Sequence, residues 1–385
     1  KPTNLLSSLD EGVNSITGNV LRVEGHIQNE IVHSEASQIQ AISKFGKLKS
    51  SLLLQYLVPL LLIFLAYQSI NSERQSGRLK LLLLQGANLT KFILAKTLAV
   101  CSYGVGLLAL TIIAYALLNL NHINFDISSR VLFFFISYSL YYFILSGLTV
   151  YFSMRGKNAN LALTSMLGVW IIWTIFLPNI LMSSVEEWHQ LPSRDAFKEA
   201  MKEDRAKGID GHNPSDERKR DLEKKVLADY GVDSLSQLPI DFWGVLMQED
   251  EEYGNKVWDK HFGNLRVVLA QQKRSYQLGG VFNPFISLQN LSMGFTGSDN
   301  FHHHDFLVQA EGYRRVFIKT LNDKHAYGGA KTGDWSFTVD KDFYKTVSDF
   351  NYQPTKLSTS LSNYVLDLLL LAFWGLVATS LLVFG

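Results

Sequence analysis

Hydrophobic and polar residues follow one another along this chain in long blocks. Five blocks are apolar and long enough to cross a bilayer as helices, because about 20 apolar residues span its hydrocarbon core. These blocks are residues 52–70, 92–118, 131–152, 161–182 and 364–384. Pro59 lies inside the first block, and membrane helices tolerate a proline kink. The pattern predicts an all-α fold: a polytopic bundle of membrane helices with five visible spans.

The polar blocks divide the chain into domains. Residues 1–50 precede the first span and include a helix expected over residues 34–49. Residues 51–182 hold four spans, residues 183–360 form a long polar domain, and residues 361–385 end the chain with the fifth span. We therefore expect a membrane domain interrupted by one large polar domain.

The polar domain is mainly helical by pattern. Candidate helices are residues 192–207, 215–230, 239–272 (one or two helices) and 306–321. Ser193 and Ser215 are expected to cap the first two. Residues 281–295 are apolar but too short to span, so they either belong to the core or lie on the outer leaflet. Residues 326–355 are rich in glycine, aspartate and aromatic residues, which indicates a loop with at most a short strand.

Residues 72–86, between the first two spans, form a short amphipathic segment. It carries too much charge to be buried in lipid, so it must lie at a membrane surface. Its leucines 79, 82 and 83 share one helical face, while Arg74, Arg78 and Gln85 lie largely off that face. Gly77 interrupts the helix near its start, and Gly86 ends it. Pattern alone is equally consistent with an ordinary interfacial helix that ties two spans together.

Basic residues predict the orientation of the spans. The connection between the first two spans carries five of them, opposed only by Glu73: Arg74, Arg78, Lys80, Lys91 and Lys96. The connection between the third and fourth spans carries Arg155 and Lys157 and no acidic residue. By the positive-inside rule both connections are cytoplasmic, and the polar domain lies outside. Five spans with an outside start further predict a sixth span before Lys1.

Charge and cysteine content restrict the possible partners and cross-links of this chain only slightly. The formal net charge is +1, so no strong field points to nucleic acid or to another highly charged partner. Cys101 is the only cysteine, and therefore no disulfide can form within the chain.

The chain shows no arrangement typical of catalysis or cofactor binding. The phosphate-binding pattern G-x-x-x-x-G-K-[ST] does not occur, because Gly156-Lys157 and residues 328–332 lack the preceding glycine. Three consecutive histidines, residues 302–304, point about 100° apart on a helix, so at most two could bind one metal ion without other ligands. Helix capping, hydrogen bonding or packing is the simpler interpretation. We predict no catalytic residue, no cofactor and no metal in this chain.

Two charged residues lie near the ends of spans. Asp367 is about one turn inside the fifth span, where it is either hydrated or in contact with a pathway or partner. Lys96 is expected to extend its ammonium group to the inner membrane surface.

Two stretches of the sequence resemble type-2 ABC exporter permeases. Residues 73–82 read E-R-Q-S-G-R-L-K-L-L, which is similar to the family's E-R-x-x-G-x-L-x-L-L coupling segment. The tail Leu84-Gln85-Gly86, followed by Lys96, resembles the branch that has a large extracytoplasmic domain of unknown function before the last span. Residues 283–314 resemble that branch's P…S…G-[TS]-D…H-H…F…A-E-x-x-R run. Arg78 and Ala95 depart from the family, which has threonine and glycine there.

The resemblance implies a division of labour between chains. Two permease subunits, identical or related, form a pathway, and a dimer of ABC ATPase subunits that binds ATP and Mg²⁺ docks beneath them. The implied ATPase-coupling residues are Glu73, Arg74, Gly77, Leu79, Leu82, Leu83 and Gly86. Glu73 would anchor the start of the helix, where the helix dipole favours a negative charge. The three leucines would contact the ATPase.

The resemblance also implies a location and further partners. The location is the bacterial inner (cytoplasmic) membrane, with membrane lipids and a periplasmic protein as partners that the resemblance allows, and no nucleic acid. This chain would be a non-catalytic subunit, with ATP hydrolysis driving export or work on an extracytoplasmic or lipid-phase substrate. The alternative is a non-transporting membrane scaffold or receptor whose outer domain binds a partner protein. Co-purification of an ATPase would separate the two.

Overall fold

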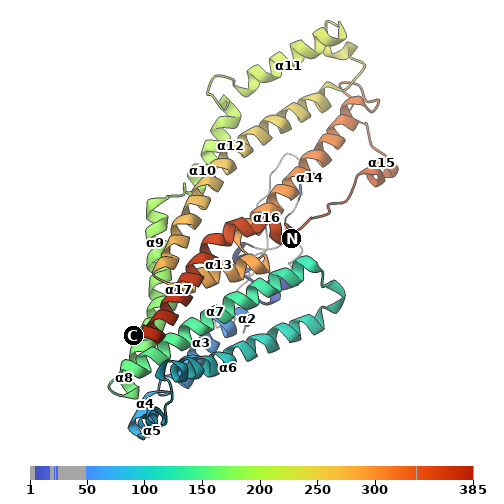
Figure 1. The fold of residues 1–385 in the computed structure, drawn as a ribbon. Coiled ribbons are helices and arrows are strands. Elements are labelled where there is room, and N and C mark those ends of the chain that lie inside the picture. Colours follow the sequence, from blue (N-terminus) through green and yellow to red (C-terminus); the bar gives the residue numbers. More distant parts are fainter. Residues whose placement is uncertain (1–4, 18–20, 22, 25–48, 335, 385) are drawn as a thin grey trace, which may run out of the picture.

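The computed structural model describes residues 5–17, 21, 23–24, 49–334 and 336–384. Every regular element within these residues is a helix, which confirms the predicted fold class. The molecule is elongated, with a helix bundle at one side and long helices that extend away from it (Figure 1). The helix expected over residues 34–49 lies outside the described residues, apart from Lys49.

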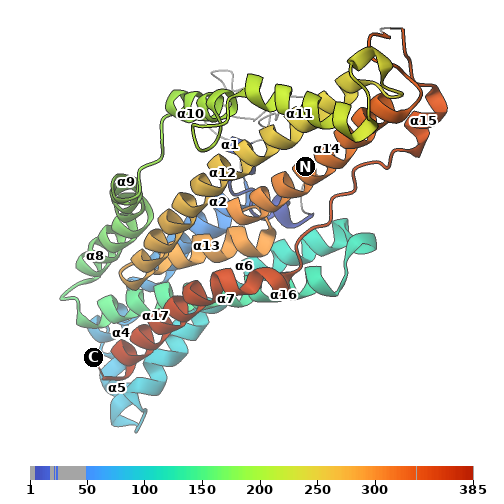
Figure 2. The same cartoon turned by 90° about the horizontal axis from the view of Figure 1, so that it is seen from above.

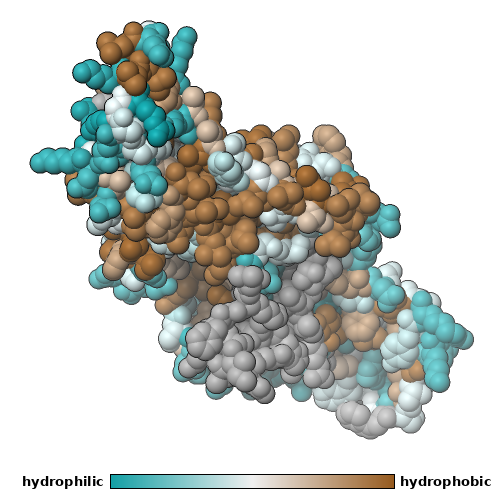
Figure 3. Space-filling view, turned by 90° about the horizontal axis from the view of Figure 1, so that it is seen from below, coloured by the Kyte–Doolittle hydropathy of each residue, from teal (hydrophilic) through white to brown (hydrophobic). Residues whose placement is uncertain are grey.

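Five helical stretches are long and apolar enough to cross a membrane, as the hydrophobic blocks predict. We call them spans A to E, and they cover Ser50–Gln75, Leu89–Leu118, Phe125–Arg155, Ala159–Trp188 and Leu357–Phe384. Figure 3 shows apolar surface across the middle of one face of the molecule and polar surface towards both ends. This is the distribution expected of a membrane-embedded bundle with polar parts on both sides.

Spans A and D accommodate a proline in the same way. Span A begins with α2 (Ser50–Leu52), η4 (Leu53–Leu57) and α3 (Val58–Ala66). Span D consists of α8 (Ala159–Ile171), η6 (Ile172–Phe176) and α9 (Leu177–Trp188). Both η4 and η6 are π-helical turns, and each ends just before a proline, Pro59 or Pro178. A proline lacks an N–H and clashes with the carbonyl four residues earlier, so a wider turn before it relieves the strain.

Helix α7 (Phe125–Arg155) is the centre of the bundle. It packs against α3, α6 (Leu89–Leu118), α8, α13 (Pro284–Thr296) and α17 (Val365–Phe384). Its tyrosines 138, 141 and 142 are completely buried. The hydroxyl of Tyr142 donates a hydrogen bond to the main-chain oxygen of Leu54 at 2.8 Å. That oxygen lies at the π-helical turn of span A, so the central helix stabilises the irregular part of its neighbour.

The residues between spans D and E, which we call the insert, form a set of helices. They are α10 (Arg194–Lys207), α11 (Ser215–Tyr230), η7 (Leu235–Gln237), α12 (Phe242–Leu278), η8 (Gly279–Val281), α13, α14 (Asn300–Tyr327) and α15 (Lys341–Thr346). Helices α12 and α14 lie side by side (Figures 1 and 2). The buried guanidinium of Arg314 joins them, because it binds Glu251 at 3.0 Å and Glu311 at 2.9 Å. The short helices α16 (Leu357–Ser360) and η9 (Leu361–Tyr364) then lead into α17.

The structure corrects several expectations about the insert. Ser193 does cap α10, accepting a hydrogen bond from the N–H of Ala196 at 3.2 Å. Ser215 does not cap α11, since Pro214 occupies the N-cap position and Ser215 is the first helical residue. Residues 239–272 belong to one helix, α12. Residues 326–355 contain no strand among those described but include the short helix α15, which Asp340 caps.

The α12–η8–α13 hairpin enters the membrane bundle to about half its depth. The indole N–H of Trp374 donates to the main-chain oxygen of Gly280 at 3.0 Å, and the amide of Asn283 donates to the oxygen of Trp173 at 2.7 Å. Trp374 lies nine residues inside α17, about 13 Å from its start. Since the hydrocarbon core is about 30 Å thick, the turn of the hairpin lies near its middle. Residues 283–295 are therefore core, while Val281 and Phe282 at the turn are exposed, and the segment does not lie flat on a leaflet.

A buried carboxylate fixes this hairpin to span E. Asp367 accepts hydrogen bonds from the side chains of Gln277 at 2.6 Å and Asn290 at 2.9 Å. Its side chain is fully buried, so the expectation of a hydrated carboxylate is wrong. The two amides come from opposite arms of the hairpin, and one carboxylate therefore holds both arms against α17.

Buried Arg130 closes the same end of the bundle. Its guanidinium binds Asp126 at 2.8 Å and donates to the main-chain oxygens of Gly294 and Phe295, at 3.3 and 3.4 Å. Those oxygens belong to the last turn of α13, where a positive charge is favoured by the helix dipole. Arg130 also donates to the oxygen of Thr355 at 2.6 Å, which joins span C to the part of the insert that leads into span E.

The N-terminal described segment docks beside the hairpin. Asp10 is buried, and it accepts hydrogen bonds from Ser292 at 2.5 Å and from Gln55 at 3.0 Å. The Gln55 amide also lies 3.1 Å from the hydroxyl of Tyr138. Burial raises the pKa of the Asp10 carboxyl, although the hydrogen bonds from Ser292, Gln55 and the Gly12 N–H act in the opposite direction.

Candidate functional site

The segment predicted to couple to another protein forms two short helices at one end of the bundle. Helix α4 (Asn71–Gln75) is followed by α5 (Arg78–Leu84), and the two lie at the end of the molecule remote from the insert (Figure 1). Gly77 separates them in a left-handed conformation, with φ of 75°, and Gly86 after α5 has φ of 87°. Both glycines occupy conformations that other residues adopt only with strain. The two predicted break points are where the chain turns.

Glu73 joins α4 to span B. Its carboxylate lies 2.8 Å from the ammonium group of Lys96 and 3.9 Å from the guanidinium of Arg78. The Glu73 side chain is only 15% exposed. The sequence-based expectation that Lys96 extends freely to the membrane surface is therefore wrong. Its ammonium group is held by a carboxylate 23 residues earlier in the chain.

Arg74 joins α4 to span C. Its guanidinium donates hydrogen bonds to the main-chain oxygens of Ser153, at 3.2 Å, and of Met154. The hydroxyl of Ser153 in turn accepts hydrogen bonds from the N–H groups of Ile70 and Asn71, at 3.1 and 3.3 Å. The last turn of α7 and the first turn of α4 thus satisfy each other's unpaired main-chain groups. Helix α4 is tied to two spans besides its own.

Helix α5 exposes most of its side chains. Leu79 is half-buried and packs against the core of the bundle, and Leu82 is also half-buried. Three leucines are exposed: Leu81 by 60%, Leu83 by 41% and Leu84 by 75%. The predicted contact face of leucines 79, 82 and 83 is thus split, because part of it is turned towards the protein's own spans.

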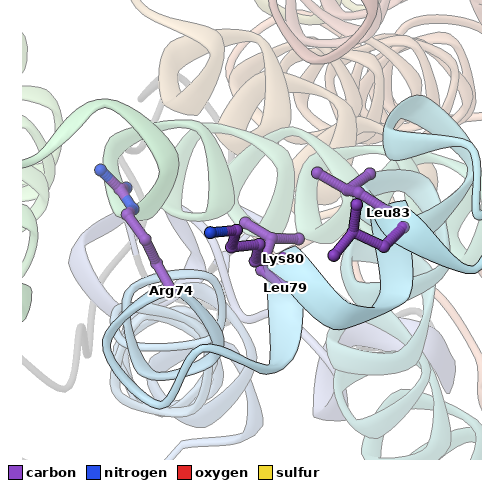
Figure 4. A pocket seen from close by; sticks show the side chains of 5 residues that line it. Arg74, Leu79, Lys80 and Leu83 are labelled. Atoms are coloured by element: carbon purple, nitrogen blue, oxygen red, sulfur yellow. The ribbon is translucent and has the colours of Figure 1, made fainter.

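A pocket of about 340 Å³ opens beside α5. Figure 4 shows its lining from α4 and α5, which consists of Arg74, Leu79, Lys80, Leu83 and Leu84. Apolar walls with a cationic rim can receive an apolar side chain flanked by a carboxylate. Leu81 and Leu84 are missing from the sequence-based site. Residues 81–84 are four consecutive leucines, which cannot all share one face of a helix. This pattern could have shown from the sequence that some of them lie outside the predicted contact face.

The histidine run, residues 302–304, lies in the insert and forms hydrogen bonds within it. The imidazole of His302 binds the carboxylate of Asp299 at 2.7 Å, and that carboxylate also accepts a hydrogen bond from Tyr364 at 2.7 Å. His304 lies 3.0 Å from the guanidinium of Arg266. These contacts join α12, α14 and η9 and match the hydrogen-bonding interpretation of the histidine run.

The fold and this segment define a multi-pass helical membrane protein with an exposed short helix anchored to its spans. A family model described as "ABC-2 family transporter protein" matches residues 6–203, more than half of the 385 residues. A second model, "Domain of unknown function (DUF3526)", matches residues 194–353, which cover most of the insert. No curated protein and no solved structure matches the chain. The chain belongs to the ABC-2 family of transporter proteins, as the sequence motifs indicate, and the family supports a permease component of an ABC transporter.

Proposed function

We propose that this chain is the permease subunit through which a separate ABC ATPase performs work in a bacterial cytoplasmic membrane. One observation carries the proposal: α4 is bonded to spans B and C, while Leu81, Leu83 and Leu84 of α5 are exposed beside an open pocket. An element that is firmly held on one side and exposed on the other can transmit a push. The basic residues around it favour the cytoplasmic side for this end.

The contacts define a route for the transmitted movement. A displacement of α5 passes to α4 through the Gly77 turn, then to α6 through Lys96 and to α7 through Ser153. Because α7 packs against most of the bundle and against α13, movement of α7 reaches the hairpin and the insert. Helices that move as near-rigid bodies are a common form of such switching.

Nucleotide chemistry takes place on another chain in this proposal. A dimer of ATPase subunits binds ATP and Mg²⁺ and engages α5 in each of two permease chains. The work is done on an extracytoplasmic or lipid-phase substrate, since the insert extends away from the membrane on the opposite side. Membrane lipids and a periplasmic protein are further proposed partners.

Co-purification of the ATPase tests the proposal. The tagged chain is expressed in its native host, and any ABC ATPase recovered with it is identified and quantified. We expect recovery with the wild type and a several-fold loss with Leu84→Asp, because a carboxylate would replace an exposed apolar contact. Leu120→Asp is the matched control, since Leu120 is 63% exposed at the other end of the bundle. Absence of ATPase with the wild type, or equal recovery in both variants, would contradict the proposal.

A further inference from the structure

We propose that the exposed face formed by the last turns of α12 and by η8, from Arg274 to Phe282, holds an anionic phospholipid of the outer leaflet. The leaflet assignment rests on the membrane orientation in the proposed function. The binding itself rests on where this helix lies in the membrane, which of its residues are exposed, and which of its charges have partners.

The depth of the site follows from its contact with span E. Gly280 lies level with Trp374, about 13 Å inside α17. Arg274 precedes Gly280 by six residues, so it lies about 9 Å closer to the surface. Lys273 confirms this level, because its ammonium group is 4.9 Å from the ring of Tyr364, just before α17 begins. By these numbers the backbone of Arg274 lies about 4 Å below the start of α17, near the outer edge of the hydrocarbon. Its long side chain can extend from there to the lipid phosphates, and the residues after it reach deeper into the hydrocarbon.

The exposed residues of this part of α12 form one stripe. Val267, Gln271, Arg274 and Leu278 are exposed and follow one another at three- and four-residue spacing, which places them on one side of the helix. The other sides are covered: Gln272 and Ser275 contact His189, which directly follows span D, and Gln277 contacts Asp367 of span E. The stripe continues beyond the helix into Val281 and Phe282, which are 41% and 70% exposed.

Arg274 is the basic residue on this part of α12 that has no hydrogen-bond or ion-pair partner among the described residues. Arg266 binds the oxygen of Phe262 and His304, and Lys273 lies 3.4 Å from Asp299. The Arg274 side chain is exposed. An exposed guanidinium at this depth needs an anion, because the interface offers less water than bulk solvent.

The order of groups along the stripe matches a phospholipid from head to tail. A guanidinium presents two parallel donors to phosphate oxygens. One turn below, Leu278 provides an apolar surface, and Val281 and Phe282 extend it towards the middle of the bilayer. A cation above an apolar stretch complements both parts of a lipid with a net negative headgroup, and this match is the reason for choosing an anionic lipid as the occupant.

Lipid retention by the purified full chain tests the inference without any ATPase. The protein is reconstituted in vesicles of phosphatidylcholine and phosphatidylglycerol, extracted in detergent, and its bound lipids are counted by native mass spectrometry. We expect preferential retention of phosphatidylglycerol by the wild type and a loss of that preference, by about fivefold or more, in Arg274→Ala. Arg274→Lys should retain part of it, since the charge stays but the paired donors are lost.

Arg220→Ala is the matched control, because Arg220 is exposed on α11 and forms no hydrogen bond or ion pair with the described residues. It should retain the wild-type preference, and equal melting temperatures would show that both variants are folded. Glycerol phosphate, which has no acyl chain, should not displace the lipid. Equal retention by Arg274→Ala and wild type would overturn the inference. So would a disulfide between the Leu278→Cys positions of two chains, which would show that protein covers the stripe.

Discussion

Oε1 of Glu73 lies 2.8 Å from Nζ of Lys96, so a charged hydrogen bond joins the short helix α4 to span B. The pair is partly shielded from water, with 15% and 33% of the two side chains exposed. Such a pair contributes about 1 kcal/mol, because part of the attraction is screened by solvent. In the proposed function its larger effect is on transmission, because it links α4 to span B.

A double-mutant cycle measures this link. We expect Glu73→Ala and Lys96→Ala each to reduce the transport driven by a given rate of ATP hydrolysis, while the membrane fold stays intact. The double variant should be little worse than either single variant, because both remove the same contact. The measurement is ATPase rate and transport in the same vesicles. Wild-type ratios of transport to hydrolysis in both single variants would contradict the coupling role.

Gly77 provides a test of the turn between α4 and α5. No atom lies within 4 Å of the position that a Cβ would occupy, so only its left-handed conformation resists a side chain. We expect Gly77→Ala to cost about 1–2 kcal/mol at this turn and Gly77→Pro to disrupt it, since proline cannot reach a positive φ. Both should impair coupling in the assay above. Gly106→Ala is the control: it also has open space around it, but it lies inside the regular helix α6.

Two buried aspartates should respond to pH with opposite signs. Burial alone would raise the pKa of Asp299, but His302, Lys273 and Tyr364 together hold it well below its usual range. Its contribution to stability is therefore present above the unfolded pKa, about 4, and is lost as the pH falls. Asp299→Asn should lower Tm at pH 7.5, and the difference from wild type should shrink below about pH 4.

Asp10 is the opposite case, because burial raises its pKa. Its contribution is present below the unfolded pKa and is lost as the pH rises through the folded pKa. The neutral variant Asp10→Asn should therefore keep or raise Tm at pH 7.5. Thermal unfolding of the full chain from pH 4 to 8 checks both variants, and a loss of Tm at pH 7.5 in Asp10→Asn would show that the charged form is needed.

Close packing of α12 against the end of α14 gives a prediction for the insert. A Cβ at Gly244 would lie 2.5 Å from the main-chain nitrogen of Ala326 and 2.7 Å from its Cα. We expect Gly244→Ala to lower the stability of the insert by about 1–3 kcal/mol, because backbone atoms cannot move aside cheaply. Gly263→Ala, on the same helix with nothing nearby, should be neutral or stabilising. Limited proteolysis of the insert compares the two, and equal sensitivity would contradict the prediction.

Features set by local sequence could be predicted, and features set by distant contacts could not. The five spans follow from runs of apolar residues, and the break at Gly77 follows from the conformational freedom of glycine. The partner of Lys96 could not be predicted, because Glu73 reaches it only after the chain has turned through α5. An unpaired lysine near a span is ordinarily expected to extend to the surface.

The depth of the α12–η8–α13 hairpin in the membrane could not be predicted from the sequence either. An apolar segment as short as α13 has the same pattern whether it lies on a leaflet or inside a bundle. The answer depends on the contacts of Gly280 with Trp374 and of Asn283 with Trp173, which join residues about a hundred positions apart. The split of the leucine face in α5 has a similar cause, since only the spans behind the helix decide which leucines remain exposed.

Helix α12 is unbroken over 37 residues, about 55 Å, from the middle of the bilayer to the far end of the insert. In such a long rigid helix, a small change of tilt at the membrane end produces a large displacement at the far end. A tilt of about 5° at the foot would sweep the far end through about 5 Å, given that length. Small rearrangements among the spans would therefore register as large excursions well beyond the membrane surface.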